Sequence, residues 1–290
     1  MDLFLNGEIV DEHRAAVPVT DRAFLFGDGV YEVLRASRGV MFEPARHFKR
    51  LRSGLDELRI GSAAVDEHDI PGVAAQLLER NGLASGDALV YIQVTRGVAP
   101  RVHHFPPVTT PRTVLVSTSA FTPKRAERES GVEVITHPDQ RWARCDIKSV
   151  NLLPNVLASQ AAASRGAYEA VLLRDGVVTE GARSSVFAVV RGELRTHPAT
   201  ERILHGITRA VVLELAREAS LPVREEPVTM SELGSASEIF LAGTTADVMP
   251  VTSIEGLPVG SGTPGEITRR LGAALDARMA AAFGAAPARA

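Results

Sequence analysis

The sequence contains a single cysteine, Cys145, among its 290 residues. One thiol cannot form an internal disulfide, and no second thiol is present to build a thiolate metal site. We therefore exclude a disulfide-stapled fold, expect no metal centre, and expect a reducing compartment, which is the cytoplasm by default. The sequence also lacks a large excess of either sign of charge, since it contains 32 Lys and Arg residues and 35 Asp and Glu residues. This balance gives no electrostatic footprint for nucleic acid or an anionic membrane.

Long hydrophobic runs are also absent. No segment approaches the roughly 20 apolar residues of a membrane span, and the first residues, MDLFLNGEIVDEHR, lack the pattern of a secretion signal. The sequence contains no P-loop, no Gly-x-Gly-x-x-Gly motif, no His-Glu-x-x-His motif and no nucleophile elbow. It therefore gives no support for a nucleotide hydrolase or a zinc-dependent hydrolase. The composition, 45% hydrophobic and 23% charged without an internal repeat, is that of a folded globular protein.

The length and pattern of the chain predict two domains. Residues 121–131, FTPKRAERESG, are charged and poor in apolar residues, which is typical of a connector. We therefore expect an α+β domain over residues 1–120 and a second domain over residues 132–290, with fraying after about residue 284.

The first half of the chain predicts antiparallel strands and two helices. Asn6-Gly7 between apolar residues is a strong hairpin signal, and Pro44 followed by Phe48, Leu51, Leu55 and Leu58 marks an amphipathic helix. The remaining expected elements are strands at 30–36, 40–42, 88–95 and 113–117 and a helix at 70–80. The second half alternates expected strands at 132–135, 170–173, 186–190 and 239–242 with helices near 149–165, 206–220 and 264–283.

Lys148 lies just before apolar residues, where we expect the helix near residues 149–165 to begin. A cation at a helix N-terminus opposes the helix dipole, so this lysine needs another reason to be there. A desolvated lysine with a lowered pKa can form a Schiff base with a carbonyl compound. The local sequence alone is also compatible with an ordinary solvated lysine.

Three further segments could bind anionic groups. Gly206-Ile207-Thr208 opens an expected helix, whose free amides can bind phosphate. Gly243-Thr244-Thr245 follows an expected strand and offers small residues that could reach the same anion. Arg101 and His103, in a proline-containing loop, could clamp a carboxylate. Each segment is equally compatible with an ordinary loop or helix start.

Taken together, these segments resemble the fold type IV, or class IV, aminotransferases, which depend on pyridoxal 5′-phosphate (PLP), and most of all those that act on D-amino acids. The similar runs keep the family's order and spacing from near residue 4 to about residue 275. They are FGDGVYEV at 26–33, QVTRG at 93–97 with PRVH at 100–103, WARCDIKS at 142–149 with NLL at 151–153, TEG at 179–181, GITR at 206–209 and TT at 244–245.

The resemblance implies a two-domain fold, with a small N-terminal α/β domain, a larger C-terminal pseudo-barrel domain, and the cofactor at the domain interface. It implies that Lys148 carries PLP as a Schiff base and moves the substrate α-proton. Glu180 would face the pyridine nitrogen, and Leu204 would pack on the cofactor ring. The phosphate would be held by Arg50, Ile207, Thr208, Gly243 and Thr244.

The resemblance also implies a substrate site. Tyr31, Arg101 and His103 would trap the substrate carboxylate, the last two reaching across from the partner subunit of a homodimer, and Val33 would line the same site. The implied activity is transamination of D-alanine or D-glutamate with 2-oxo acids such as 2-oxoglutarate or pyruvate, in ping-pong half-reactions. Arg35 and Arg183 depart from the family's pattern, and we hypothesise that Arg183 favours D-glutamate as amino donor.

Four alternatives stay open at this point. Branched-chain L-amino acid aminotransferases and (R)-amine transaminases resemble the chain in scaffold and lysine, although the Arg101-x-His103 pair favours the D-amino acid branch. A 4-amino-4-deoxychorismate lyase would eliminate pyruvate and need no amino acceptor. A binding or regulatory protein could have kept the scaffold without the activity, which the joint presence of Lys148, Glu180 and Arg50 argues against.

Overall fold

The computed structural model describes residues 1–284, apart from the side chain of Ala64. The chain forms two compact units. The first unit comprises Met1–Thr122, Ile147–Asn151 and, of the described residues, 281–284, and the second comprises Pro123–Asp146 and Leu152–Ala280. The fraying expected after about residue 284 lies outside the described residues.

This division differs from the expected domains at Ile147–Asn151 and, among the described residues, at 281–284, which were expected in the second domain and belong to the first unit. Part of the expected connector is a short helix, α5 (Arg125–Ser130), which buries none of its side chains. A segment of five residues can return to the first unit because its backbone forms hydrogen bonds there, which apolar periodicity along the sequence does not reveal.

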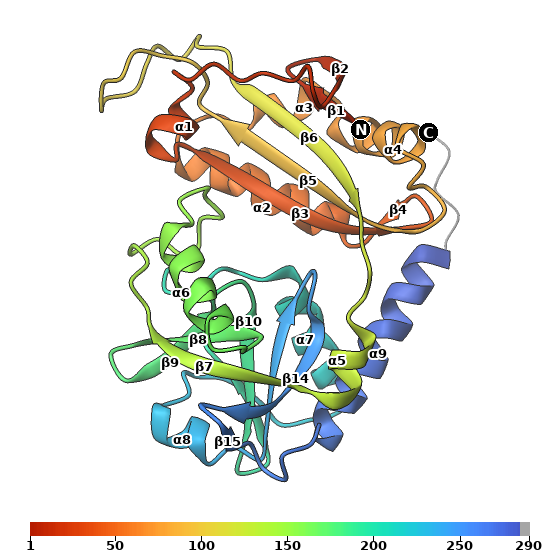
Figure 1. The fold of residues 1–290 in the computed structure, drawn as a ribbon, viewed down its shortest axis with the longest axis vertical. Helices are drawn as coiled ribbons and strands as arrows, with labels where there is room; N and C mark the ends of the chain where they lie inside the picture. Colours follow the sequence, from red (N-terminus) through yellow and green to blue (C-terminus); the bar gives the residue numbers. More distant parts are fainter. Residues whose placement is uncertain (285–290) are drawn as a thin grey trace. The chain divides into compact units, whose positions relative to one another are not determined.

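The first unit contains an antiparallel sheet of six strands (Figure 1). The strands are β1 (Asp2–Leu5), β2 (Glu8–Asp11), β3 (Gly29–Ser37), β4 (Val40–Met41), β5 (Asp87–Thr95) and β6 (Thr113–Ala120), in the spatial order β2-β1-β6-β5-β3-β4. Asn6 and Gly7 both adopt positive φ angles, 52° and 99°, which is the conformation that a two-residue hairpin turn requires. The predicted hairpin between β1 and β2 is confirmed.

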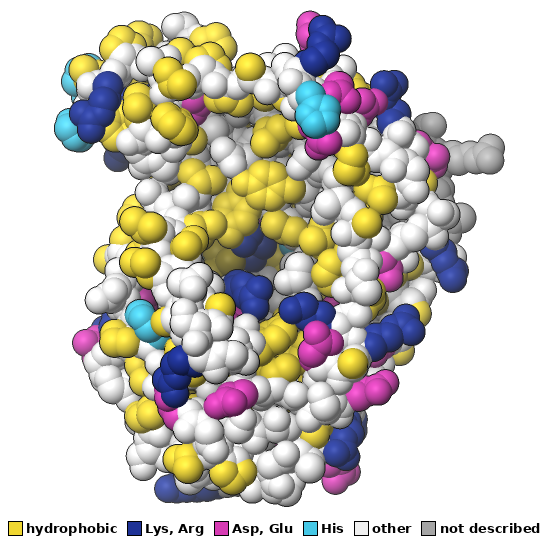
Figure 2. Space-filling model, in the orientation of Figure 1, with side chains coloured by type: hydrophobic (Ala, Val, Ile, Leu, Met, Phe, Trp, Pro, Cys, Tyr) yellow, Lys and Arg dark blue, Asp and Glu magenta, His cyan; other side chains and the backbone are white. Residues whose placement is uncertain are grey.

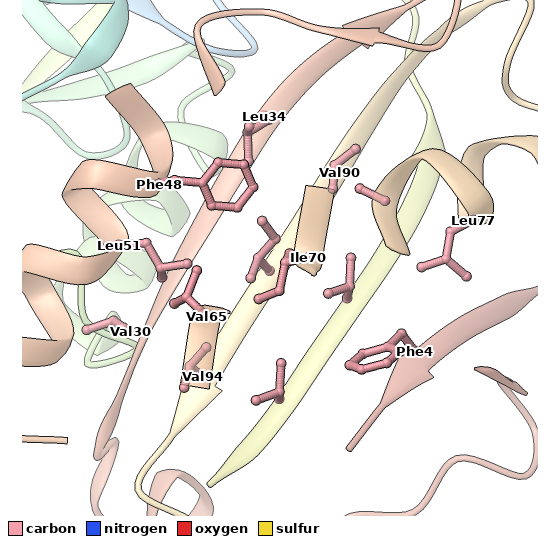
Figure 3. Close-up of a cluster of buried hydrophobic side chains, with 14 of the residues drawn as sticks. Phe4, Val30, Leu34, Phe48, Leu51, Val65, Ile70, Leu77, Val90 and Val94 are labelled. Carbon is pink, nitrogen blue, oxygen red and sulfur yellow. The ribbon is translucent and has the colours of Figure 1, made fainter. Parts of the chain in front are cut away.

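Helices of the first unit cover one face of this sheet. They are α2 (Pro44–Glu57), α3 (Ala63–Asp66) and α4 (Ile70–Arg80), whereas the short α1 (Arg22–Phe26) contributes no side chain to the main core of the unit. Phe48 of α2 points toward Leu34 of β3 in this core, to which Leu51 of α2 also belongs (Figure 3). The predicted apolar stripe of α2 is therefore its buried face.

Side chains alternate between the two faces of β3, because successive residues of a strand point in opposite directions. Val30 and Leu34 belong to the core beneath the helices, and Glu32 lies on the same face, bonded to α2. Tyr31 and Val33 consequently lie on the opposite face, and both are partly exposed.

The second unit contains nine strands in a curled sheet (Figure 1). They are β7 (Val132–Pro138), β8 (Glu169–Arg174), β9 (Val177–Gly181), β10 (Ser185–Val190), β11 (Glu193–Thr196), β12 (Val223–Glu225), β13 (Glu238–Gly243), β14 (Asp247–Ile254) and β15 (Leu257–Pro258). The order is β12-β11-β10-β13-β14-β7-β8-β9, with β15 paired to β14.

The connection between β9 and β10 explains the curl. β9 is an edge strand, whereas β10 is near the other edge, yet only residues 182–184 join them. Three residues span only about 10 Å, so the sheet has to bend until the edge of β9 approaches β10. This curled sheet encloses a mostly valine and alanine core.

Three longer helices complete the second unit, together with α5 and the short α8 (Met230–Gly234). They are α6 (Leu153–Ala163), α7 (Ile207–Glu218) and α9 (Glu266–Gly284). α6 packs on β8, and α7 packs on β13. Within residues 1–284 no helix combines the length and apolar character that a membrane span needs.

Candidate active site

Lys148 lies in a short segment, Ile147–Asn151, beside β3. The Tyr31 amide donates to the Lys148 carbonyl at 3.0 Å, and the Val150 amide donates to the Gly29 carbonyl at 3.1 Å. The Lys148 ammonium lies 4.2 Å from the centre of the Tyr31 ring. The segment therefore forms an isolated β-bridge with β3, which holds the lysine beside Tyr31.

The expected helix start at Lys148 is wrong. α6 begins at Leu153, with Pro154 in its first turn, a position where proline fits well. The preceding backbone pairs with β3 instead of forming helical hydrogen bonds. The helix dipole therefore does not act on Lys148, and the reason for a lysine here is its place beside Tyr31.

Glu32 forms the centre of a buried ionic cluster in the first unit. It is fully buried, and its carboxylate accepts hydrogen bonds from Arg50 Nε at 2.7 Å and Arg50 Nη2 at 2.8 Å. His47 Nδ1 lies 2.7 Å from the same carboxylate. This bidentate pairing fixes the guanidinium of Arg50 in one orientation.

The electrostatics of this cluster favour an ionised Glu32 and a neutral His47. Burial alone would raise the pKa of Glu32, but the hydrogen bonds from Arg50 and His47 outweigh it and lower this pKa from 4.5 to about 2. Burial lowers the pKa of His47. The charge of Lys148 adds to both downward shifts, so its amine lies close enough to act on this cluster.

The second unit carries a group of small residues at the start of α7. Gly206 is the N-cap, and no side chain caps the helix, so its first amides can bind an anion. A Cβ atom on Gly206 would lie 2.9 Å from the Ser185 hydroxyl, which explains the glycine. Ile207 is partly exposed, and Thr208 is buried with 8% of its surface exposed.

The predicted Gly243 and Thr244 lie at the same end of the sheet. Ser185, which contacts Gly206, pairs with Ala242 across the sheet, and the turn after β13 follows directly. Thr244 is partly exposed in this turn. The structure thus brings the two predicted anion-binding segments of the second unit together.

Glu180 is a buried carboxylate at the end of β9, 5% exposed. The Leu204 amide donates to both of its oxygens, at 3.1 and 3.2 Å, and Arg141 donates to one of them. Burial raises the pKa of Glu180, and Arg141 and the Leu204 amide oppose this rise. A buried carboxylate with these partners is suited to hold a proton on a neighbouring nitrogen.

Arg141 is a site residue that the sequence analysis missed. It donates to Asp139 through Nε at 2.8 Å and Nη2 at 2.7 Å, in addition to Glu180. Burial opposes ionisation of Asp139, but Arg141 lowers the pKa of this carboxyl to about 2. No local pattern marks Arg141, because its two carboxylate partners meet only through the pairing of β7, β8 and β9.

Arg101 and His103 are exposed on the loop between β5 and β6. Both flank the ring of Phe26: the Arg101 guanidinium lies 5.3 Å and the His103 ring 5.6 Å from its centre. Within the described part of one protomer, no hydrogen bond, ion pair or ring contact joins either residue to Tyr31. The structure brings the predicted pair together but leaves it apart from the third member of the trap.

The two departures from the family pattern have partners of their own. Arg35 is buried, stacks on the Phe121 ring at 4.0 Å and lies 3.5 Å from Asp87. Arg183 lies 3.5 Å from Glu169 and donates to the Tyr168 carbonyl at 2.9 Å. The preference for D-glutamate that we hypothesised for Arg183 stays a prediction.

Comparisons with known proteins place this chain in a family. The amino-transferase class IV family matches residues 29–254. The chain is a class IV aminotransferase. D-Alanine aminotransferase of Bacillus licheniformis is 42% identical over 276 residues, which cover 95% of this chain and 96% of that protein. D-Alanine aminotransferase of Staphylococcus epidermidis is 42% identical over 269 residues, 93% of this chain and 94% of that protein.

Solved structures show the same fold. The branched-chain amino acid aminotransferase of Escherichia coli superposes with a TM-score of 0.86 at 27% identity, covering 95% of this chain and 93% of that one. The branched-chain enzyme of T.th., solved with N-(5′-phosphopyridoxyl)-L-glutamate, gives a TM-score of 0.84 at 27% identity, with 99% and 95% coverage. The expected fold type IV architecture is confirmed, and the enzyme uses PLP, as class IV aminotransferases do.

The described residues fit this cofactor. The first unit offers an arginine held by Glu32, which suits a phosphate, and an amine beside Tyr31. The second unit offers the open start of α7 for a phosphate and a buried carboxylate for the ring nitrogen. Among residues 1–284 no group of histidine, cysteine, aspartate or glutamate side chains is arranged to hold a metal ion.

The Glu32 cluster makes stability depend on pH. We expect replacement of Glu32 by glutamine to destabilise the protein above pH 4.5, because the ionised carboxylate, whose folded pKa of about 2 lies below its unfolded value, then contributes fully. Protonation removes this contribution as the pH falls from 4.5 toward 2. The difference in the free energy of unfolding between wild type and Glu32→Gln, from urea titrations at several pH values, should therefore shrink in this range.

The control variant is Glu8→Gln, at an exposed position of β2, which should follow the wild type at every pH. A difference between wild type and Glu32→Gln that stays constant from pH 7 to pH 3 would contradict the low pKa of Glu32.

Proposed function

We propose that the enzyme transfers the amino group of D-amino acids, of the D-alanine or D-glutamate type, to 2-oxo acids such as 2-oxoglutarate or pyruvate. The observation that carries this proposal is the 42% identity with D-alanine aminotransferases over 95% of the chain. The branched-chain enzymes with the same fold are only 27% identical. The Arg101-x-His103 pair on its exposed loop adds a site for the carboxylate of an α-amino acid.

Lys148 is the residue that acts on the substrate α-carbon in this proposal. PLP, when bound, supplies an electron sink for the charge that remains when the α-proton leaves. The Lys148 Nζ would accept this proton as general base and would hold it for return to the substrate–cofactor adduct, as a positioned amine can. The pairing of Ile147–Asn151 with β3 holds the amine in place beside Tyr31.

In the proposal, the phosphate of the cofactor is bound by Arg50, Ile207, Thr208, Gly243 and Thr244. Arg50 presents a guanidinium whose orientation is fixed by Glu32. Ile207 and Thr208 supply helix amides, and Gly243 and Thr244 supply the adjoining turn. An uncapped helix start and a fixed arginine together favour a phosphate group over a neutral ligand.

Glu180 holds the proton on the ring nitrogen of the cofactor in the proposal. Hydrogen bonds fix the orientation of its carboxylate: both oxygens accept a hydrogen bond from the Leu204 amide, and one also accepts a hydrogen bond from Arg141. The Leu204 side chain would pack on the cofactor ring in this proposal. A fixed anion at this place strengthens the electron sink.

Stereochemistry tests the proposed substrate class most directly. Addition of D-alanine to the PLP form should abolish the absorbance band of the lysine-bound cofactor within seconds, and L-alanine should leave it unchanged. Lys148→Ala should lack this band and should convert D-alanine more slowly by about 10²- to 10⁴-fold, because the base is absent, whereas Lys49→Ala, at an exposed lysine of α2, should keep both the band and the reaction.

The rival activities give different results in the same cuvette. Loss of the band with L-leucine and not with D-alanine would establish a branched-chain L-amino acid aminotransferase. If an (R)-amine without a carboxylate abolished the absorbance band as fast as D-alanine does, the proposed carboxylate trap would be excluded. A 4-amino-4-deoxychorismate lyase would release pyruvate without an amino acceptor.

We also propose that the working form is a homodimer, in the cytoplasm. Among the described residues of one protomer, no contact joins Tyr31 to Arg101 or His103, so a complete trap requires the latter two from a second copy. The loop that carries these residues also exposes large hydrophobic side chains, and Figure 2 shows them gathered over the end of the first unit where Figure 1 places this loop. They are Phe24 of α1 and Val98, Val102, Phe105 and Val108, between 37% and 83% exposed.

The second unit carries an exposed apolar stripe of its own. Leu153, Val156 and Leu157 of α6 are 69%, 56% and 54% exposed, and their spacing of three and four places them on one helix face. Contiguous exposed apolar surface of this kind marks a protein interface in a water-soluble protein.

Charge placed on the loop surface should separate the dimer. Phe24→Glu combined with Val108→Glu should convert a dimer into a monomer in size-exclusion chromatography with light scattering, because burying two carboxylates against a partner is costly. The monomer should bind PLP and lose most of its turnover of D-alanine. Leu257→Glu, at a 70% exposed position of β15, is the matched control and should stay dimeric; a wild type that runs as a fully active monomer would refute the dimer.

A further inference from the structure

A buried network of Arg22, Asp28 and Arg96 holds the loop between β5 and β6. Arg22 Nε donates to Asp28 Oδ2 at 2.7 Å. Arg96 binds the same carboxylate through Nε at 2.8 Å and Nη2 at 3.0 Å. Arg22 is 3% and Arg96 is 7% exposed, so one carboxylate is shared by two buried guanidinium groups.

One arm of this network ends between the two residues of the proposed trap. Arg22 Nη1 donates to the carbonyl of Val102 at 2.7 Å, and Val102 stands between Arg101 and His103 in the sequence. The Arg22 guanidinium also lies 4.7 Å from the centre of the Phe26 ring, the ring that Arg101 and His103 flank. Arg22 therefore contacts both the backbone and the aromatic support of the pair.

The other arm fixes the start of the same loop. The Arg96 guanidinium donates to the carbonyls of Leu58, at 2.6 Å, and Arg59, at 3.0 Å, and it stacks on the ring of Phe105 at 3.7 Å. The loop is consequently held on both sides of Arg101 and His103, although their own side chains are exposed to solvent.

We propose that Arg22, Asp28 and Arg96 are positioning residues, which hold Arg101 and His103 in the conformation that binds the substrate carboxylate. This inference rests on the proposed function, because it assigns the loop to the carboxylate trap. A carboxylate is bound well only when its donors are fixed within a fraction of an ångström. Arg101 and His103 are exposed on a long loop, so their fixed positions depend on the buried network of Arg22, Asp28 and Arg96 that binds this loop.

Arg22→Lys tests the network with little risk to folding, since lysine keeps a charge for Asp28. A single ammonium cannot reproduce the fork that joins Asp28 to the Val102 carbonyl. We expect the KM for D-alanine and for the 2-oxo acid to rise about tenfold or more, as for a lost charge-assisted hydrogen bond. The dissociation constant of PLP and the melting temperature should stay near the wild-type values.

The matched control is Arg112→Lys, at the far end of the same loop. Arg112 also donates to a backbone carbonyl, that of Ile60, at 3.0 Å through Nε, and no contact among the described residues joins it to Arg101 or His103. Its KM values should stay within about twofold of wild type. Hydrogen exchange of residues 98–106 should quicken in Arg22→Lys and not in Arg112→Lys, because the Arg112 guanidinium contacts the loop only at the Val108 carbonyl among the described residues.

A double variant separates positioning from a general structural role. If Arg22 acts through the trap, Arg22→Lys should add no further rise in KM in the background of Arg101→Ala with His103→Ala. A rise in KM of equal size in both backgrounds, or wild-type KM values in Arg22→Lys, would overturn the inference. Failure of the wild type to convert D-alanine would instead overturn the proposed function, and a normal KM in the Arg101→Ala, His103→Ala variant would remove the trap assignment from which the inference starts.

Discussion

The pairing of five residues, Ile147–Asn151, with the edge of β3 is the interaction on which the first unit's part of the site depends. It takes the chain out of the second unit for one short stretch and returns it at Leu152. Backbone hydrogen bonds of the Lys148 carbonyl and the Val150 amide with β3 hold the segment beside Tyr31. A helical start at this position would have pointed the amine along a different axis and left the edge of β3 without these partners.

Buried charges then give the remaining groups their orientation. Glu32 fixes Arg50, Arg141 and the Leu204 amide fix Glu180, and Asp28 fixes Arg22 and Arg96. Each carboxylate has at least two hydrogen-bond donors, which is the condition under which a buried charge is tolerated. Arg50 is thus held by a partner, Glu32, that is more buried than itself, and in our proposal the exposed Arg101 gains its order from the buried Arg22 and Arg96.

Much of this arrangement could be predicted from the sequence. The Asn6-Gly7 hairpin, the apolar stripe of α2 and the strands β3, β5 and β13 follow from local pattern, and the resemblance of the runs around Lys148, Glu180 and Gly206 pointed to the family. The membership of Ile147–Asn151 in the first unit could not be predicted, because pairing with β3 is a long-range contact without a local signature. The role of Arg141 in the site could not be predicted for the same reason, since its partners Asp139 and Glu180 are distant from each other in sequence.

The central claim is that Lys148 joins the cofactor. The chain contains three lysines, Lys49, Lys124 and Lys148, and Lys124 lies 4.6 Å from the Tyr168 ring in the second unit. Borohydride reduction of the PLP-loaded enzyme followed by peptide mass mapping decides between them. The account predicts a pyridoxyl group on Lys148 at one per chain; a group on Lys49 or Lys124, or no attached group at all, would contradict it.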